Sequence, residues 1–473
     1  MNSKKTTGTR YLLVLVMILG AVMVTLYSHS SPFYLMNTWV DVDGNLTIGK
    51  CIANGIVVYR DIFEQRGPLF YFLHALAYLI SRDSFLGIWV LEMLCTAGFV
   101  FAVYKILALY ERENNIVFLP FLLFLIYSSR SFGLGGSPEE FCLPLIAGSL
   151  YLLLKALKEG RLLTVWEYFG IGLFSGAVLW IKFSMLGFYI GSVIPVLFLI
   201  FYKKEYRNLL DLITGVCAGV ALISLPVFLY FAVHNALDSL FHVYFYINLN
   251  YYPFNDSPVY KLYFAALGLL GAVKSNWKYW IVTAIGLIQL FRIEKRPSVI
   301  AELIFGAAGL TMVIYSGGQQ FAYYALILSV YSIFGLLAIP KTGVKTAAAA
   351  LLASIVLAVY VGIPKYNARI RASKNDYVQY RFAAEMDENA TLLNYQFLDG
   401  GFFFAADILP TQYYSWSFNV LNDEILEEQN RYVAEGAVNY IVASDRDVEE
   451  ADVNHRYELI DEADDYFLYR RTD

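Results

Sequence analysis

The stretch that decides the fold is "WVDVDGNLTIGKCIANGIVVYRDIFEQRGPLFY", residues 39–71. It is a polar island in a chain that is 58% hydrophobic and only 16% charged. Asp41 and Asp43 stand at the start of a segment whose apolar residues, Leu46, Ile48 and Ile52, predict a helix. Later in the same stretch come Arg60, Asp61, Glu64 and Arg66. Such a concentration of charged residues in an otherwise apolar chain indicates a functional role for this stretch.

The composition around this stretch is typical of a polytopic membrane protein. The chain has 473 residues, of which 17% are aromatic, whereas soluble domains are about 45–50% apolar overall. The first apolar run, residues 11–27, follows Lys4, Lys5 and Arg10, and no small-residue cleavage site is evident after it. We therefore interpret it as a retained first helix rather than a signal peptide.

The C-terminal part of the chain has a different charge balance. Residues 365–473 contain 10 Lys and Arg against 22 Asp and Glu, whereas the remainder contains 25 against 18. This shift predicts two domains, a membrane domain at 1–364 and an acidic, water-soluble domain at 365–473. Within the second, apolar runs at 391–397, 438–444 and 466–470 predict strands, and 422–437 predicts a helix. The expected fold there is a small α/β domain.

The membrane domain is predicted to be all-α, with about eleven transmembrane helices plus juxtamembrane helices. A span needs about 20 apolar residues. The candidates are 11–28, 84–108, 115–128, 140–157, 164–181, 184–202, 209–232, 277–291, 298–315, 321–339 and 347–363.

Basic residues orient these spans. They occur at the N-terminus and in the loops 154–161, 202–207, 292–296 and 340–345, which the positive-inside rule assigns to the cytoplasm. All of them fall on one side if 67–80, which is short for a span, lies along the outer surface as a juxtamembrane helix. The segment 259–273 is interpreted in the same way. The N-terminus is then cytoplasmic and the C-terminal domain extracytoplasmic.

This topology gathers candidate site residues on the outer face. Asp41 and Asp43 lie in the first loop, and Glu139 and Glu140 in a second loop, "SSRSFGLGGSPEEF" at 128–141. Carboxylates near a low-dielectric boundary can have a raised pKa and act as general bases. The alternative is structural, because acidic residues at helix starts also serve as caps. Spacing alone leaves both interpretations open.

The cations of the same face are Arg60, Arg66 and Lys182. Arginine suits bidentate phosphate contact, and the alternative is a cation that reaches for lipid headgroups. Lys182 lies within an almost continuous apolar stretch, so it needs an anionic partner more than a loop lysine does.

A third feature is the aromatic loop 242–258, which could stack on a sugar or belong to an interfacial aromatic belt. The histidines and cysteines match no metal-site spacing.

Residues 41–72 resemble the first external loop of the GT-C superfamily of integral-membrane glycosyltransferases. The nearer branch contains the bacterial aminoarabinose transferases and protein O-mannosyltransferases (families 39 and 83). The matching motifs are "DVDGNLTIGKCIANG", "GIVVYRDIF" and "QRGPLFYF", in which Arg66 stands where the family usually has lysine. "GGSPEEFCLP" (135–144) is similar to the second acidic loop, and "GAVLWIKF" (176–183) to a span end with lysine. Tyr323 stands at the position where the family frequently has histidine, so the sequence departs from the family pattern there.

The resemblance implies an inverting transferase that moves a sugar from a polyprenyl-phosphate donor to a cell-envelope glycan, lipid or protein. Asp41 aligns with the acidic residue that activates the acceptor, with Asp43 in reserve, and Glu140 or Glu139 would position acceptor or sugar. Arg60, Arg66 and Lys182 would hold the lipid phosphate. Tyr59, Tyr323 and Tyr324 are the candidate contacts to acceptor or sugar. No cofactor or metal site is required, although a divalent ion shared by Asp41 and Glu140 is compatible with these residues, and no nucleic acid is expected.

Two other classes of protein compete with this interpretation. A transporter or flippase would favour inverted repeats and charges near the bilayer midplane, neither of which stands out in the sequence. A non-catalytic subunit of an envelope-polysaccharide system would tolerate loss of the acidic residues. Mutation of Asp41 separates this last interpretation from an enzyme.

Overall fold

The structure is a computed structural model that describes residues 2–253, 257–341, 349, 351–361, 372–444 and 456–472. The chain divides into two compact units. The first, here called the helical unit, comprises Met1–Ser31, Trp89–Leu229 and Pro253–Tyr366. The second, the mixed unit, comprises Pro32–Ile88, Tyr230–Tyr252 and Asn367–Asp473.

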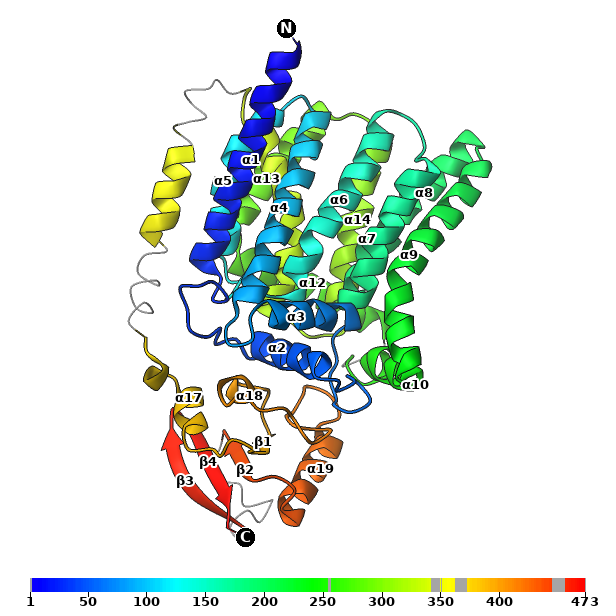
Figure 1. The fold of residues 1–473 in the computed structure, drawn as a ribbon. Coiled ribbons are helices and arrows are strands. Elements are labelled where there is room, and N and C mark those ends of the chain that lie inside the picture. Colours follow the sequence, from blue (N-terminus) through cyan, green and yellow to red (C-terminus); the bar gives the residue numbers. More distant parts are fainter. Residues whose placement is uncertain are drawn as a thin grey trace. The chain divides into compact units, whose positions relative to one another are not determined.

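Long helices that run side by side form the helical unit, as Figure 1 shows for α4, α6 and α7. Its closest helix pair is α8 with α14, where a Cβ on Gly191 would lie 2.0 Å from the carbonyl oxygen of Phe305. Small residues at such crossings let backbones approach, as is common in membrane helix packing. The elements are α1 (Asn2–Tyr27), α4 (Leu86–Leu109), η1 (Glu113–Phe118), α5 (Leu119–Tyr127), α6 (Pro138–Lys158), α7 (Val165–Lys182), η2 (Phe183–Leu186), α8 (Gly187–Lys203), α9 (Arg207–Val233), α12 (Pro258–Ser275), α13 (Trp277–Ile293), α14 (Pro297–Tyr315), η4 (Ala322–Phe334) and α15 (Gly335–Ala338).

Five helical segments are long and apolar enough to cross a membrane, judged by length and composition among the described residues. They are Leu86–Leu109, Pro138–Lys158, Val165–Lys203, Arg207–Val233 and Pro297–Tyr315. Shorter apolar helices include Tyr11–Tyr27, Glu113–Tyr127 and Ala322–Ala338. A multi-pass helical membrane protein is thus confirmed, while the count of eleven spans stays a prediction. The last predicted span, 347–363, lies partly outside the described residues.

In the mixed unit, α2 (Val40–Ala53) and α3 (Pro68–Ile80) pack side by side (Figure 1). A Cβ on Gly49 would lie 2.4 Å from the backbone of His74, so a glycine is needed at this approach. Gly67 and Pro68 begin α3, since proline is well suited to the first helical turn. The predicted helix from Asp41 and the short apolar helix at 67–80 are both confirmed. Both lie in the unit that also contains the C-terminal residues.

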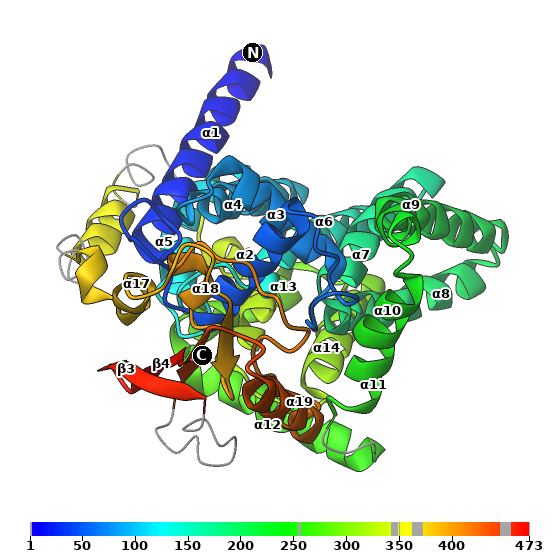
Figure 2. The same ribbon diagram turned by 60° about the horizontal axis from the view of Figure 1, so that its bottom comes forward.

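The C-terminal part of the mixed unit holds a four-stranded sheet in the order β1-β2-β4-β3. Strands β1 and β2 are parallel, with Leu393 opposite Ile441, and the other pairs are antiparallel. The short helix α18 lies against α2, which can be followed in Figure 2. The elements are η5 (Lys374–Asp376), α17 (Val378–Ala383), β1 (Leu392–Tyr395), α18 (Phe402–Ala405), α19 (Asn422–Glu435), β2 (Tyr440–Ala443), β3 (Tyr457–Ala463) and β4 (Tyr466–Arg471).

The predicted α/β character of the C-terminal residues is confirmed by three strands and helix α19, while β3 was not predicted. The aromatic segment 242–258 was interpreted as a loop, and this was wrong for its first half. Its first half is helical, formed by the π-helix η3 (Leu240–Ile247) and α11 (Asn248–Asn250), and the short helix α10 (Leu237–Ser239) precedes η3. The predicted domain boundary at 364/365 lies outside the described residues, and the domain division stays a prediction.

Candidate functional site

The first cluster of charged residues is in the mixed unit, where α2 and α3 meet. Arg66 Nη2 lies 2.9 Å from Asp41 Oδ2, and Arg66 Nη1 lies 3.8 Å from Glu64 Oε2. Both partners of the closer pair keep contact with solvent, at 21% and 15% side-chain exposure. The structure thus brings together the acid proposed for the acceptor and a cation proposed for phosphate. We call this the Asp41–Arg66 pair.

Buried tyrosines hold the Arg66 backbone in place. The Tyr59 hydroxyl donates to the Arg66 carbonyl oxygen, and the Arg66 N–H donates to the Tyr71 hydroxyl at 3.0 Å. Tyr71 in turn donates to Glu64, whose pKa is raised to about 7 because burial outweighs the opposing effect of Arg66. Tyr59 is 1% exposed and its ring stacks on Phe231. In this structure Tyr59 therefore supports the loop, and its predicted contact with acceptor or sugar stays a prediction.

Asp43 has a different environment from Asp41, although both belong to α2. Two positions along a helix turn a side chain by about 200°. Asp43 is 1% exposed, and neither of its carboxylate oxygens has a hydrogen-bond partner within the described part of the chain. Burial raises its pKa well above the usual range, and the nearby Asp399 carboxylate adds to the effect. A buried carboxyl group without donors favours its protonated form.

Asp399 is the acid that faces Asp43, and the sequence analysis did not single it out. It accepts hydrogen bonds from the Thr47 hydroxyl at 2.6 Å and from the Gly401 N–H at 3.0 Å. Burial raises its pKa to about 6. Gly401 adopts a φ of +86°, and a Cβ there would lie 3.2 Å from Asp43 Oδ1. The tight glycine turn therefore brings the C-terminal segment against α2.

Arg60 has partners of its own in the same unit. Its guanidinium lies 2.7 Å from Asp61 Oδ1 and also donates to the His234 carbonyl oxygen at 2.6 Å. Hydrogen bonding with Arg60 lowers the pKa of Asp61. Arg60 is 40% exposed. The structure thus does not pair Arg60 with Asp41, and its phosphate role stays a prediction.

The second cluster is in the helical unit and joins four predicted residues. The Lys182 ammonium, at the end of α7, lies 2.5 Å from Glu139 Oε1 in the first turn of α6. The same ammonium lies 3.8 Å from the ring centroid of Tyr324 and 5.1 Å from that of Tyr323, both on η4. Glu139 is fully buried and Lys182 is 19% exposed. The predicted need of Lys182 for an anionic partner is confirmed.

Glu140 points to another acid rather than to Lys182. Its Oε2 accepts the Gly136 N–H at 2.9 Å, and the Glu92 carboxyl group on α4 is close enough to interact with it electrostatically. The Ser28 hydroxyl donates to Glu92 Oε2 at 2.6 Å. Glu92 was missed, although a lone acid in an apolar helix is a signal for a functional site.

The sequence left open a divalent ion shared by two acids. Across the residues that the structure describes, no group of three or more His, Cys, Asp or Glu side chains could hold a metal ion. Asp41 and Glu140, the two acids considered for a divalent ion, belong to different units. The shared ion therefore stays a prediction.

Solved structures show which known fold the chain shares. ArnT from Cupriavidus metallidurans in the apo state matches with a TM-score of 0.62 at 11% identity, over 98% of each chain. ArnT bound to undecaprenyl phosphate matches with a TM-score of 0.64 at 10% identity, also over 98% of each chain. The archaeal oligosaccharyltransferase AglB from Archaeoglobus fulgidus gives a TM-score of 0.45 at 14% identity, over 98% of this chain and 74% of AglB. The chain has the GT-C type of fold that the resemblance predicted.

Sequence comparison then gives the particular family. Residues 2–362 match the family described as "Putative competence-induced protein Ccs4 N-terminal domain", and the chain belongs to this family. Comparison with curated proteins gives no match.

Proposed function

We propose that this protein is a membrane glycosyltransferase that moves a sugar from a polyprenyl-phosphate donor to an acceptor on the outer face of the membrane. The observation that carries the proposal is the Asp41–Arg66 pair, a carboxylate 2.9 Å from a guanidinium, both mostly buried but with some solvent contact. Its context is a GT-C fold that is also the fold of ArnT, which was solved with undecaprenyl phosphate bound. Such a transfer needs a carboxylate that can act as the base for the acceptor and a cation that stabilises the leaving phosphate, both within reach of the reacting atoms.

Each member of the pair has a defined task in this proposal. Arg66 binds the lipid phosphate, since a guanidinium matches phosphate geometry with two parallel hydrogen bonds. As the bond between the anomeric carbon and the phosphate oxygen breaks, negative charge grows on the phosphate, and a fixed cation stabilises it. Once the phosphate has replaced Asp41 on the Arg66 guanidinium, the released carboxylate accepts the proton of the incoming hydroxyl or amine, which attacks from the face opposite the phosphate. The configuration at the anomeric carbon is thereby inverted.

Asp41 fits the role of base better than Asp43 does. Asp43 is buried, its pKa is raised well above the usual range, and it faces Asp399. A protonated, enclosed carboxyl group can neither accept a proton nor reach an acceptor. Asp41 keeps solvent contact, and Arg66 is its ion-pair partner at 2.9 Å.

In the helical unit, the proposal gives Lys182 the task of holding an anionic group. Glu139 occupies that place in this structure, with the ring of Tyr324 beside the ammonium. Lysine binds phosphate as a point charge, and an aromatic wall keeps the amine oriented. Tyr323 and Tyr324 thus position Lys182, and their predicted contact with sugar or acceptor is kept as part of the proposal.

The proposal can be tested in two steps with the full chain in nanodiscs. Native mass spectrometry with undecaprenyl phosphate should show binding that is at least tenfold weaker in Arg66→Gln and unchanged in Arg82→Gln, an arginine outside the pair. Transfer from polyprenyl-phosphate sugars, measured as release of the lipid phosphate, should fall about 10²–10⁴-fold in Asp41→Asn, the range for loss of a general base.

The two steps separate the tasks of the pair. Asp41→Asn should still bind undecaprenyl phosphate, because the carboxylate does not hold the lipid. Full transfer activity in Asp41→Asn would show that another residue is the base. Equal lipid binding by Arg66→Gln and the parent protein would remove Arg66 from the donor site.

A further inference from the structure

The mixed unit contains a cavity of about 210 Å³ that no role above uses. It lies between η3 with the turn that follows α11, the segment before α19, and the start of α19. The cavity is lined by several side chains, among them His242, Ile247, Tyr251, Tyr413, Leu421 and Glu424. They come from two parts of the chain that are far apart in sequence, so the fold itself creates this cavity.

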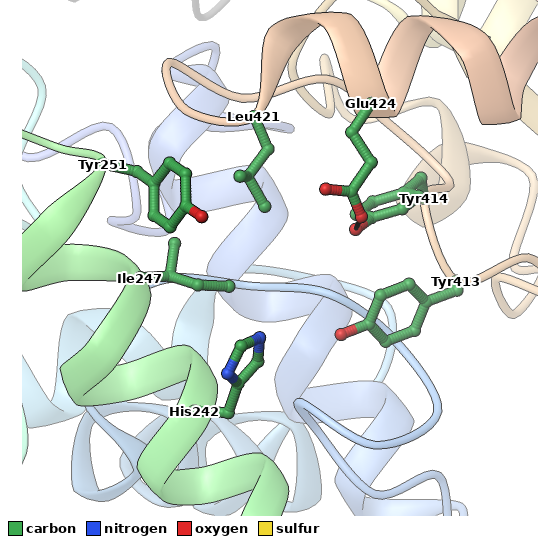
Figure 3. Close-up of a pocket in the computed structure, with 7 residues that line it drawn as sticks. All are labelled: His242, Ile247, Tyr251, Tyr413, Tyr414, Leu421 and Glu424. Atoms are coloured by element: carbon green, nitrogen blue, oxygen red, sulfur yellow. Dashed lines mark hydrogen bonds between the residues drawn. The ribbon is translucent and has the colours of Figure 1, made fainter.

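Polar groups from both parts turn toward the same space, as Figure 3 shows. The hydroxyls of Tyr251 and Tyr413 and the imidazole of His242 point inward, and Leu421 and Ile247 add apolar surface beside Tyr251. Tyr251 is 53% exposed, so the cavity is reached from solvent. The lining therefore combines aromatic surface, aliphatic surface, and both donors and acceptors of hydrogen bonds.

Hydrogen bonds fix two of these groups before any ligand arrives. The Tyr413 hydroxyl donates to the Tyr59 carbonyl oxygen at 3.2 Å, and its own carbonyl oxygen accepts the Phe63 N–H at 2.9 Å. The buried Tyr414 donates its hydroxyl proton to Glu424 Oε1 at 2.7 Å, which orients the carboxylate. A preorganised lining loses less conformational entropy when it binds a ligand.

The chemistry of the lining matches a sugar ring. A pyranose has apolar C–H faces for aromatic rings and an edge of hydroxyls that both donate and accept hydrogen bonds. Tyrosine offers an apolar body with a polar end, and the carboxylate and imidazole can accept from hydroxyls. The volume is below the roughly 300–1,000 Å³ of pockets for drug-sized ligands, so one ring fits better than an extended chain. A lipid tail would offer no hydrogen bond to the carboxylate or the imidazole.

We propose that this cavity is a saccharide subsite that holds one sugar ring of the acceptor. The inference rests on the proposed function and narrows it, because it makes the acceptor a glycan rather than a protein or a simple lipid. The subsite belongs to the mixed unit, the unit that contains Asp41. Binding of a sugar by this subsite needs no donor lipid and can be measured separately from transfer.

The test uses the full chain in nanodiscs without donor. Saturation-transfer difference NMR is recorded with the methyl glycosides of glucose, galactose, mannose and N-acetylglucosamine. We expect saturation of at least one glycoside, with a signal at least fivefold weaker in Tyr251→Ala and in Glu424→Gln. Both replaced side chains are exposed, so these variants should fold. Glu427→Gln, an exposed acid of α19 outside the cavity lining, is the matched control and should retain the signal.

Several results would overturn the subsite. The first is the absence of a saturation-transfer signal from all four glycosides, and the second is an equal signal in the variants and the parent protein. The third is binding of a lysine-containing tripeptide instead of the glycosides, with this binding lost in Glu424→Gln. The proposed function fails in a different way, through full transfer activity in Asp41→Asn. If that happens while the glycoside signals behave as expected, the cavity remains a glycan-binding site and the transferase assignment falls.

Discussion

The two units each contain a carboxylate paired with a cation, and the two pairs differ in their surroundings. In the mixed unit, Asp41 and Arg66 both keep contact with solvent. In the helical unit, Glu139 is fully buried and Lys182 is enclosed by Glu139 and the ring of Tyr324. The two cations are similarly exposed, so the difference lies in the carboxylates, of which Asp41 keeps solvent contact and Glu139 does not. A carboxylate with solvent contact can give up its cation at lower cost than a fully buried one, so a ligand should displace Asp41 more easily than Glu139.

The largest expected effect is on stability, from Lys182→Met. This change removes the ammonium that balances a fully buried carboxylate, and breaking a buried pair on one side costs about 3–5 kcal/mol. Chemical or thermal unfolding in detergent would show the loss. The double variant Lys182→Met/Glu139→Leu is the matched control, because replacing both charges with apolar groups is often neutral. If Lys182→Met unfolds like the parent protein, the pair is not enclosed as described.

The next effect is a gain of stability at alkaline pH in Asp43→Asn. The folded protein raises the pKa of Asp43 above its unfolded value, so folding retains a proton that the unfolded chain releases above about pH 4. Stability is therefore fully present at low pH and declines as pH rises from there. The amide cannot ionise and can donate to Asp399, so we expect a gain of about 1–3 kcal/mol at pH 8.

Unfolding measured between pH 4 and pH 8 would check this expectation. Asp43→Asn should show a flatter decline than the parent protein, and part of the remaining slope should come from Asp399, whose pKa is about 6. Asp423→Asn, at an exposed position of α19, serves as control and should follow the parent curve. A parallel decline in Asp43→Asn would mean that Asp43 is already ionised in the folded protein.

The contrast between Asp41 and Asp43 also marks the limit of sequence reasoning. The sequence places both at the start of a helix, and the structure confirms that helix, because apolar spacing and the position of turns are local properties. Which aspartate is buried depends on Asp399 and Gly401, more than 350 residues away. Such long-range packing leaves no periodic signal in a single sequence. The same holds for Tyr59, whose burial follows from stacking on Phe231.

The second cluster was more predictable. Lys182 lies in a nearly continuous apolar stretch, and this local context correctly indicated an anionic partner. Glu92 carried the same signal, a lone acid within an apolar segment, and could have been found by the same reasoning. Its pairing with Glu140, however, depends on how α4 packs against the start of α6. Composition reveals that a charge needs a partner, and tertiary structure decides which partner it has.

A smaller effect is expected from Tyr324→Leu. The Lys182 ammonium lies 3.8 Å from the Tyr324 ring centroid, and a partly desolvated cation–π contact contributes about 0.5–2 kcal/mol. Unfolding should therefore show a loss within this range. Tyr323→Leu is the natural control, because its ring centroid is 5.1 Å away and its contribution should be smaller. Equal losses in both variants would point to packing of η4 rather than to the cation.

The smallest stability effect is expected from Arg66→Gln, and it completes the comparison. Breaking the Asp41–Arg66 pair should cost about 1 kcal/mol, the upper end of the range for surface pairs, since both side chains are mostly buried but keep some solvent contact. The Arg66 backbone stays anchored, because its hydrogen bonds to Tyr59 and Tyr71 do not involve the side chain. Unfolding curves would thus nearly overlay those of the parent protein, while binding of undecaprenyl phosphate falls. A variant that loses lipid binding and several kcal/mol together would make Arg66 a structural residue like Lys182, and the distinction between the two pairs would disappear.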